Sequence, residues 1–304
     1  MKVASIAIHE RGFIGRTQTE MLNWVREKCL SLKSLSPDII VFPEVVFIMY
    51  PPHDPTPYDE FFSLALEEMK KTAAEVASYV IFNIHEPHDS NPDYRYITTF
   101  MLSRTGEIVG KYRKMHTVDV ETIENRIIPG EGPCVVDTEF GKIGIATCFD
   151  IGWRSYWQKM KDMGAKAVIW TSAYDGGNLL DAYAVTNMYW VISSVRTCHA
   201  RIIDPVGRTV AESAIWDNLC FADIDLDMEI FHIDNQAHKI HDIRKELGDT
   251  VDIRTLSEEN VFTVSSKNPD WSIDRIKKEF GLVTYCDYHM RAEEVQNEWR
   301  NKKL

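Results

Sequence analysis

The first part of the chain alternates short apolar segments with helical ones, and this alternation restricts the fold more than any other feature. Residues 2–8, 39–42 and 79–84 are almost wholly apolar and too short for helices, which is typical of buried strands. Between them, residues 17–32 and 58–77 repeat apolar side chains at helical spacing. Such alternation favours a layered α/β domain in which helices pack on a sheet.

Later strands pair as hairpins, so the sheet is expected to be mixed rather than purely parallel. Glycine-containing turns divide residues 97–112 and 134–146 into two hairpins. Residues 113–133 show no period and contain Pro129-Gly130, which predicts a long and functional loop. Four prolines predict a loop at 51–57. Helices are also predicted at 153–163 and 179–190, and strands at 167–171, 191–195, 200–203, 208–212 and 221–226.

The last stretch differs in composition from the rest. We predict a domain over residues 1–227 and a C-terminal extension over residues 228–304. The extension is charged, has helical candidates at about 238–247 and 272–280, and shows little apolar pattern for a core. It is expected to pack on the domain or on a partner subunit, as the arm of a homo-oligomer.

Charge and composition exclude several classes of function. The 304 residues include 46 acidic and 34 basic ones, for a net charge of −12, which argues against binding nucleic acid or an anionic membrane surface. No apolar run approaches the roughly 18 residues of a membrane span, and the first residues lack a signal-peptide pattern. Six cysteines without a Cys-x-x-Cys pair are typical of reduced thiols, so a cytoplasmic location is expected.

Three polar residues follow predicted strands directly. Glu44 comes after Phe42-Pro43, Lys114 lies just past the second strand of a hairpin, and Cys148 lies at the end of a strand and before a helix. Ligands of α/β sheets bind at such strand ends, and a thiol there can act as a nucleophile. Taken singly, each has an ordinary alternative: a helix-start carboxylate, a solvated lysine and a small buried side chain.

Together, the motifs around these residues resemble the nitrilase superfamily of carbon–nitrogen hydrolases. The ordered set is Phe42-Pro43-Glu44, Tyr112-Arg113-Lys114-x-His116 and Cys148-x-Asp150, and the likeness covers residues 2–227. Further matching segments are Gly106 to Lys114, Pro129-Gly130, Gly141-Lys142-Ile143-Gly144 and Asp204-Pro205-x-Gly207.

The resemblance implies a four-layer α-β-β-α sandwich and a Glu-Lys-Cys catalytic set. Carried over, Cys148 is the nucleophile, Glu44 is the general base, and Lys114 stabilises the oxyanion together with the backbone N–H of Phe149. A lysine beside the thiol is expected to lower the thiol pKa.

The family often has a second glutamate between the lysine and a Pro-Gly. We assign it to Glu124, six residues before Gly130, with Glu121 as the second choice. A solvated loop carboxylate is the alternative for either residue.

The residues after the nucleophile bear on the substrate. Relatives commonly have Arg and Phe-Pro-Glu after Cys-x-Asp, whereas this chain has Ile151-Gly152-Trp153-Arg154. Phe149-Asp150 resembles the amidase and carbamoylase branches more than true nitrilases, which favours a small-molecule amide or N-carbamoyl substrate. Candidate substrate-binding residues are Phe149, Arg154, Tyr174 and Asn178. Nitrile hydrolysis, N-acyl transfer and a non-catalytic assembly subunit remain as alternatives.

Cofactor and metal signatures are weak. The chain has neither a Gly-x-Gly-x-x-Gly motif nor a P-loop, so no nucleotide cofactor is expected. His53, His85 and His88 could suggest a metal, but Pro87 interrupts any helical pair. His238 and His241 fit a surface face, and no metal is predicted.

Overall fold

The structure, a computed structural model, describes residues 1–48 and 57–302 and divides into two compact units, Met1–Leu226 and Asp227–Leu304. This division lies one residue before the boundary that the sequence predicted. The predicted proline-rich loop at 51–57 lies outside the described residues except for Pro57. The candidate ligand His53 lies outside them as well.

The first unit is built on two six-stranded sheets, the first and the second sheet. The first sheet has the order β12-β1-β2-β3-β4-β5, and the second has the order β11-β10-β9-β8-β7-β6. The first sheet contains β1 (Lys2–Ile6), β2 (Ile39–Val41), β3 (Tyr79–Pro87), β4 (Arg95–Leu102), β5 (Ile108–Arg113) and β12 (Leu219–Asp223). The second contains β6 (Cys134–Thr138), β7 (Gly141–Thr147), β8 (Ala167–Ser172), β9 (Trp190–Val195), β10 (Arg201–Ile203) and β11 (Thr209–Glu212).

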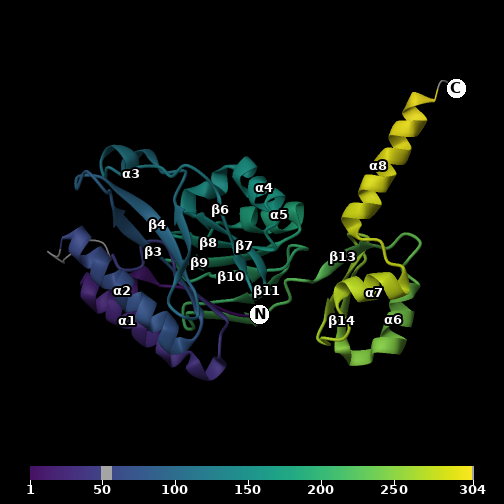
Figure 1. Ribbon diagram of the computed structural model, residues 1–304, viewed down its shortest axis with the longest axis horizontal. Helices are drawn as coiled ribbons and strands as arrows, with labels where there is room; N and C mark the ends of the chain where they lie inside the picture. Colours follow the sequence, from purple (N-terminus) through teal and green to yellow (C-terminus); the bar gives the residue numbers. More distant parts are fainter. Residues whose placement is uncertain (49–56, 303–304) are drawn as a thin grey trace. The chain divides into compact units, whose positions relative to one another are not determined.

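Helices cover the outer face of each sheet, which completes the predicted α-β-β-α sandwich (Figure 1). On the first sheet lie α1 (Gln18–Ser31) and α2 (Tyr58–Val76), whose apolar faces share one core with Phe42, Phe82 and Phe100. On the second sheet lie α4 (Arg154–Asp162) and α5 (Asn178–Asn187). The four-layer fold that the resemblance implied is therefore confirmed.

The central strands of each sheet run parallel, so Glu44 and Cys148 lie beyond the carboxyl ends of parallel strands. Strands β1, β2 and β3 run parallel, as do β7, β8 and β9. The carboxyl end of β2 leads to Glu44, and the carboxyl end of β7 leads to Cys148. Ligands commonly bind beyond the carboxyl ends of parallel strands.

The segment at 113–133 contains one short element that the sequence did not indicate. Helix α3 (Asp119–Ile123) has only five residues, too few to show a helical period. The carboxylate of Glu121 accepts the N–H of Val118 at 3.0 Å and so caps this turn.

The second unit has a core of its own, contrary to the expectation of little apolar pattern there. It contains β13 (Glu229–His232), β14 (Val251–Leu256), β15 (Val261–Ser266), α6 (Lys239–Leu247), α7 (Ile273–Phe280) and α8 (Tyr285–Asn301). The sheet order β13-β15-β14 places Phe231 beside Phe262, and both pack with Ile243 and Ile276. The three strands are short, and β13 and β14 carry charged residues, which hides their pattern in the sequence.

Across the described residues, the helices fall short of the combination of length and hydropathy that a membrane crossing requires.

Gly110 on β5 tests how closely the two sheets approach. A Cβ at this position would lie 2.6 Å from Val136 Cγ2 and 3.1 Å from Met101 Cβ. We expect Gly110→Ala to lower the free energy of unfolding of this unit by about 1–3 kcal/mol, because the neighbours are packed and cannot withdraw. Gly12→Ala is the control, since nothing lies within 4 Å there. Urea unfolding of both variants checks this, and equal stabilities would contradict it.

Candidate active site

Glu44 is held at a sharp turn just beyond β2. The next residue, Val45, has a positive φ of 45°, which is uncommon for a β-branched residue. Asn83 on β3 holds this turn, because its Oδ1 accepts the Val45 N–H at 2.9 Å and its Nδ2 donates to Thr99 Oγ1 at 2.8 Å. The carboxylate of Glu44 is thereby fixed and buried, at 4% exposure.

Cys148 occupies a second strained position at the end of β7. Its φ is 47°, and it begins the 3-10 helix Cys148–Gly152. The indole of Trp170 donates to the Cys148 carbonyl at 3.0 Å, which holds the strained residue from behind. Backbone strain of this kind is concentrated at functional sites, where the surrounding structure fixes it.

Asp150 joins the thiol motif to the lysine motif. Its buried carboxylate accepts the Thr147 N–H at 2.8 Å and the Tyr112 hydroxyl at 2.6 Å. It also contacts His116, through the backbone N–H at 3.0 Å and the ring Nδ1 at 2.7 Å. These bonds explain why the Cys-x-Asp and Lys-x-His patterns occur together: one carboxylate ties β5 of the first sheet to β7 of the second.

Lys114 lies between two carboxylates and is fully buried. Its Nζ donates to Glu44 Oε1 at 2.9 Å and to Glu121 at 2.8 Å (Oε1) and 2.9 Å (Oε2). Burial by itself lowers the pKa of Lys114, but Glu44, Cys148 and Glu121 raise it above its ordinary value. The lysine is therefore a permanent cation at neutral pH.

The thiol of Cys148 is neutral, contrary to the expectation that a nearby lysine lowers its pKa. Burial and then the charge of Glu44 raise the pKa of Cys148 to about 12, and the opposing effect of Lys114 is smaller. Glu44 also hydrogen-bonds the thiol, which favours its protonated form. The positive charge of the lysine is largely compensated by Glu44 and Glu121, so the thiol requires a base to lose its proton.

Of the two glutamates considered from the sequence, Glu121 lies beside the lysine, whereas Glu124, the first choice, does not. Glu121 faces inward from α3 and binds both Lys114 Nζ and the Val118 N–H. Glu124 is the C-cap residue of the same helix and is exposed. Residues three apart share a face of a regular helix, but Glu124 lies just past the last residue of α3 and does not bind Lys114, which spacing along a loop does not reveal.

The predicted substrate-binding residues divide into two groups. Phe149 and Tyr174 lie at the site and are partly exposed: Phe149 follows Cys148, and burial with the neighbouring Cys148 and Glu44 raises the pKa of Tyr174 to about 12. Arg154 and Asn178 are exposed at the first positions of α4 and α5.

Other residues of the site were not singled out in the sequence. The N–H of Ala173, just after β8, donates to Glu44 Oε2 at 3.1 Å. The ring of Trp153 stacks on His116 at 4.0 Å and meets Phe149 edge-on at 5.1 Å. The position of Ala173 after a strand end was an available signal, whereas the stacking depends on side-chain packing alone.

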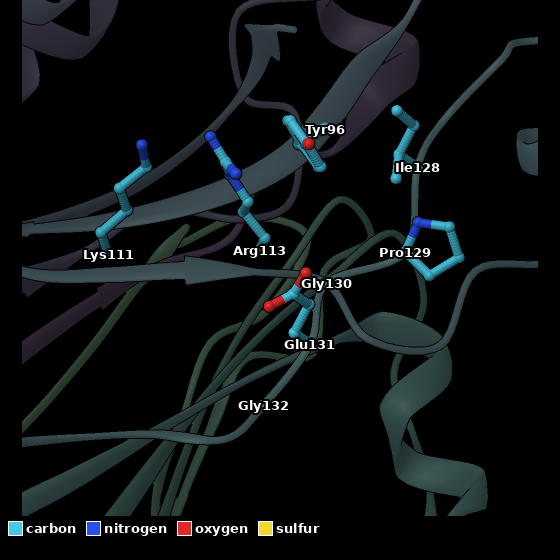
Figure 2. A pocket seen from close by; sticks show the side chains of 8 residues that line it. All are labelled: Tyr96, Lys111, Arg113, Ile128, Pro129, Gly130, Glu131 and Gly132. Atoms are coloured by element: carbon cyan, nitrogen blue, oxygen red, sulfur yellow. The ribbon is translucent and has the colours of Figure 1, made fainter. Parts of the chain in front are cut away.

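A separate cavity lies on the other face of β5. It measures about 370 Å³, and Tyr96, Lys111, Arg113 and the segment Ile128–Gly132 line it (Figure 2). Side chains alternate along a strand, so Lys111 and Arg113 point away from Tyr112 and Lys114. Both cations donate to the buried carboxylate of Glu86, which neutralises much of their charge.

Metal ligation finds no support in the geometry of the described residues. Across 1–48 and 57–302, no three His, Cys, Asp or Glu side chains converge in a way that could hold an ion. The ring of His85 is buried, and burial lowers its pKa to about 3.

An α-β-β-α sandwich with a thiol, a lysine and a carboxylate at adjoining strand ends defines the nitrilase type of hydrolase. The chain belongs to the carbon–nitrogen hydrolase family, whose family model matches residues 2–230.

Relatives and solved structures agree with this family. The chain is 30% identical over 167 residues to the deaminated glutathione amidase of Dictyostelium discoideum, covering 46% of this chain and 57% of that protein. It is 28% identical over 162 residues to an omega-amidase of Saccharomyces cerevisiae, covering 45% and 55%. The matched region thus spans little more than half the length of these two relatives. The crystal structure of an amidase from Nesterenkonia superposes with a TM-score of 0.63 at 18% identity, covering 80% of this chain and 95% of that one.

The state of the thiol can be measured directly. We expect the absorbance change of thiolate formation at Cys148, obtained by subtracting Cys148→Ala, to have a midpoint well above pH 9, because burial and Glu44 disfavour the anion. Glu44→Gln removes the negative charge and leaves Lys114, so the midpoint should fall. An unchanged or higher midpoint in Glu44→Gln would contradict the assignment of the shift to Glu44.

Proposed function

We propose that this protein hydrolyses a non-peptide C–N bond, in an amide or N-carbamoyl group, through a thioester on Cys148. The observation that carries the proposal is the contact chain from the Cys148 thiol to Glu44 and from Glu44 to Lys114 Nζ at 2.9 Å. A neutral thiol bound to a carboxylate is suited to base-assisted attack on a carbonyl carbon. The names of two relatives, a deaminated glutathione amidase and an omega-amidase, support an amide substrate.

In the first half of the reaction, Glu44 takes the thiol proton as the sulfur of Cys148 bonds to the substrate carbonyl carbon. The carbonyl oxygen becomes an oxyanion, which Lys114 and the backbone N–H of Phe149 stabilise. As the tetrahedral intermediate collapses, the C–N bond breaks and Glu44 returns its proton to the leaving nitrogen. Ammonia or an amine departs, and the acyl or carbamoyl group remains on sulfur.

In the second half, Glu44 takes a proton from water, and the hydroxyl oxygen bonds to the thioester carbon. The same donors stabilise the second oxyanion, the C–S bond breaks, and the proton on Glu44 returns to sulfur. Glu121 contributes as a positioning residue, because its carboxylate holds Lys114 Nζ at 2.8 Å and leaves Glu44 to the thiol.

The mouth of the site supports a small substrate with an apolar part. Phe149, Trp153 and Tyr174 are partly exposed there and offer aromatic surface. Arg154, exposed at the start of α4, is a candidate clamp for a substrate carboxylate. Asn178, exposed at the start of α5, is proposed to contact the polar end of the substrate.

We further propose a cytoplasmic location and a homo-oligomer. The mechanism needs Cys148 as a thiol, and a reducing compartment preserves it. The exposed apolar side chains of α8 support an assembly of copies.

Three substitutions test the mechanism. We expect Cys148→Ala to abolish turnover, and Glu44→Gln and Lys114→Ala each to lower kcat by about 10²–10⁴-fold, because the base or an oxyanion donor is lost. Ammonia release from aliphatic amides, N-carbamoyl amino acids and nitriles measures this, with circular dichroism as the control for folding. A near-normal rate in any of the three would refute the assigned role. Release from nitriles alone would replace the amide substrate, and product formation only with an added amine would indicate acyl transfer.

Glu121 and Glu124 form a matched pair for the second glutamate. We expect Glu121→Gln to lower kcat about tenfold or more, since Lys114 loses a charged partner at 2.8 Å. Glu124→Gln, one helical turn away and exposed, should leave kcat within about twofold. The same ammonia assay compares them, and a larger loss in Glu124→Gln would reverse the assignment.

A further inference from the structure

Helix α8 carries an apolar stripe that the second unit covers only at one end. Tyr285, Tyr288, Ala292, Val295 and Trp299 follow one another at spacings of three and four residues, which is the a/d pattern of a helix that pairs with another helix. None of the described residues of α8 is buried, although a helix of this length has little stability without packing.

The covered end is held by contacts within the unit. The ring of His232 stacks on Tyr288 at 4.5 Å, and the Tyr288 hydroxyl donates to Asp234 Oδ2 at 2.6 Å. Beyond this turn, Val295 and Trp299 are 48% and 57% exposed on the same face. Figure 1 shows α8 extending beyond the sheet and helices of its own unit. Contiguous exposed apolar side chains of this kind mark an interaction surface.

The charges beside the stripe indicate which partner fits. Arg291 and Glu298, seven residues apart, both flank one side of the stripe and are exposed. When two such helices pack antiparallel about a twofold axis between Ala292 and Val295, Arg291 of each copy faces Glu298 of the other. The parallel arrangement brings Arg291 opposite Gln296 instead, so Arg291 has no acidic partner there.

We propose that α8 pairs antiparallel with α8 of a second copy of this chain. The small Ala292 packs against Val295 of the other copy, and Trp299 packs over the turn that carries Tyr288. Two Arg291–Glu298 ion pairs, related by the twofold axis, set the register. The pairing takes the proposed homo-oligomer further by naming its surface, and it is independent of the proposed reaction.

Charge reversal tests the pairing with the full chain. Arg291→Glu alone and Glu298→Arg alone each place like charges opposite one another twice, so each variant should raise the dissociation constant for this contact about tenfold or more. An equimolar mixture of the two variants restores opposite charges at both contacts and should restore association. The double variant Arg291→Glu/Glu298→Arg should also associate as the wild type does.

Sedimentation velocity measures the association over a range of concentrations at low salt. These conditions are chosen because two short helices bury less than the roughly 1,200 Å² of a stable interface, so a weak and salt-dependent contact is expected. Trp299→Ala should weaken association, while Met290→Ala, an equally exposed apolar residue on the opposite side of α8, should not. Circular dichroism and ammonia release serve as controls that the variants remain folded.

The outcomes separate the proposals. A monomeric wild type at all concentrations would overturn both the homo-oligomer and the α8 pairing. An oligomer whose mass is the same in the wild type, both charge variants and Trp299→Ala would overturn the α8 pairing alone. Failure to detect amide hydrolysis would leave these readings unaffected, because they depend on mass.

Discussion

The arrangement of the site depends on one buried cation. Lys114 has no exposed surface, and a charge moved from water into a protein interior costs several kcal/mol unless it is paired and hydrogen-bonded. Glu44 and Glu121 supply those partners. The cation in turn offsets the charge of two carboxylates that lie close together, so a base is available beside the thiol.

The two sheets are needed to assemble this cluster. Glu44 follows β2 and Lys114 follows β5 in the first sheet, whereas Cys148 follows β7 in the second. Asp150 connects them through Tyr112, Thr147 and His116. A four-layer sandwich brings the ends of both sheets to one place, and strained turns at Val45 and Cys148 point the side chains inward. The fold and the site are therefore two consequences of the same packing.

Much of this could be predicted where the signal is local. Glu44, Lys114 and Cys148 each lie at or just past the end of a strand, and strand ends are visible in a sequence. Glu121 could not be chosen over Glu124, because α3 is too short to show a period and its direction depends on the lysine that it contacts. The core of the second unit was missed because Phe231 and Phe262 meet only when β13 pairs with β15.

By itself, the sequence determined the α/β layering, the three motifs and their order along the chain, because hydrophobic period and strand ends are local properties. Only the tertiary structure decided which glutamate binds Lys114 and that the pKa of Cys148 is raised rather than lowered. Both depend on burial and on side-chain contacts of about 3 Å, which a local sequence pattern does not show. The balance of nearby charges, rather than the presence of one lysine, fixes the protonation of the thiol.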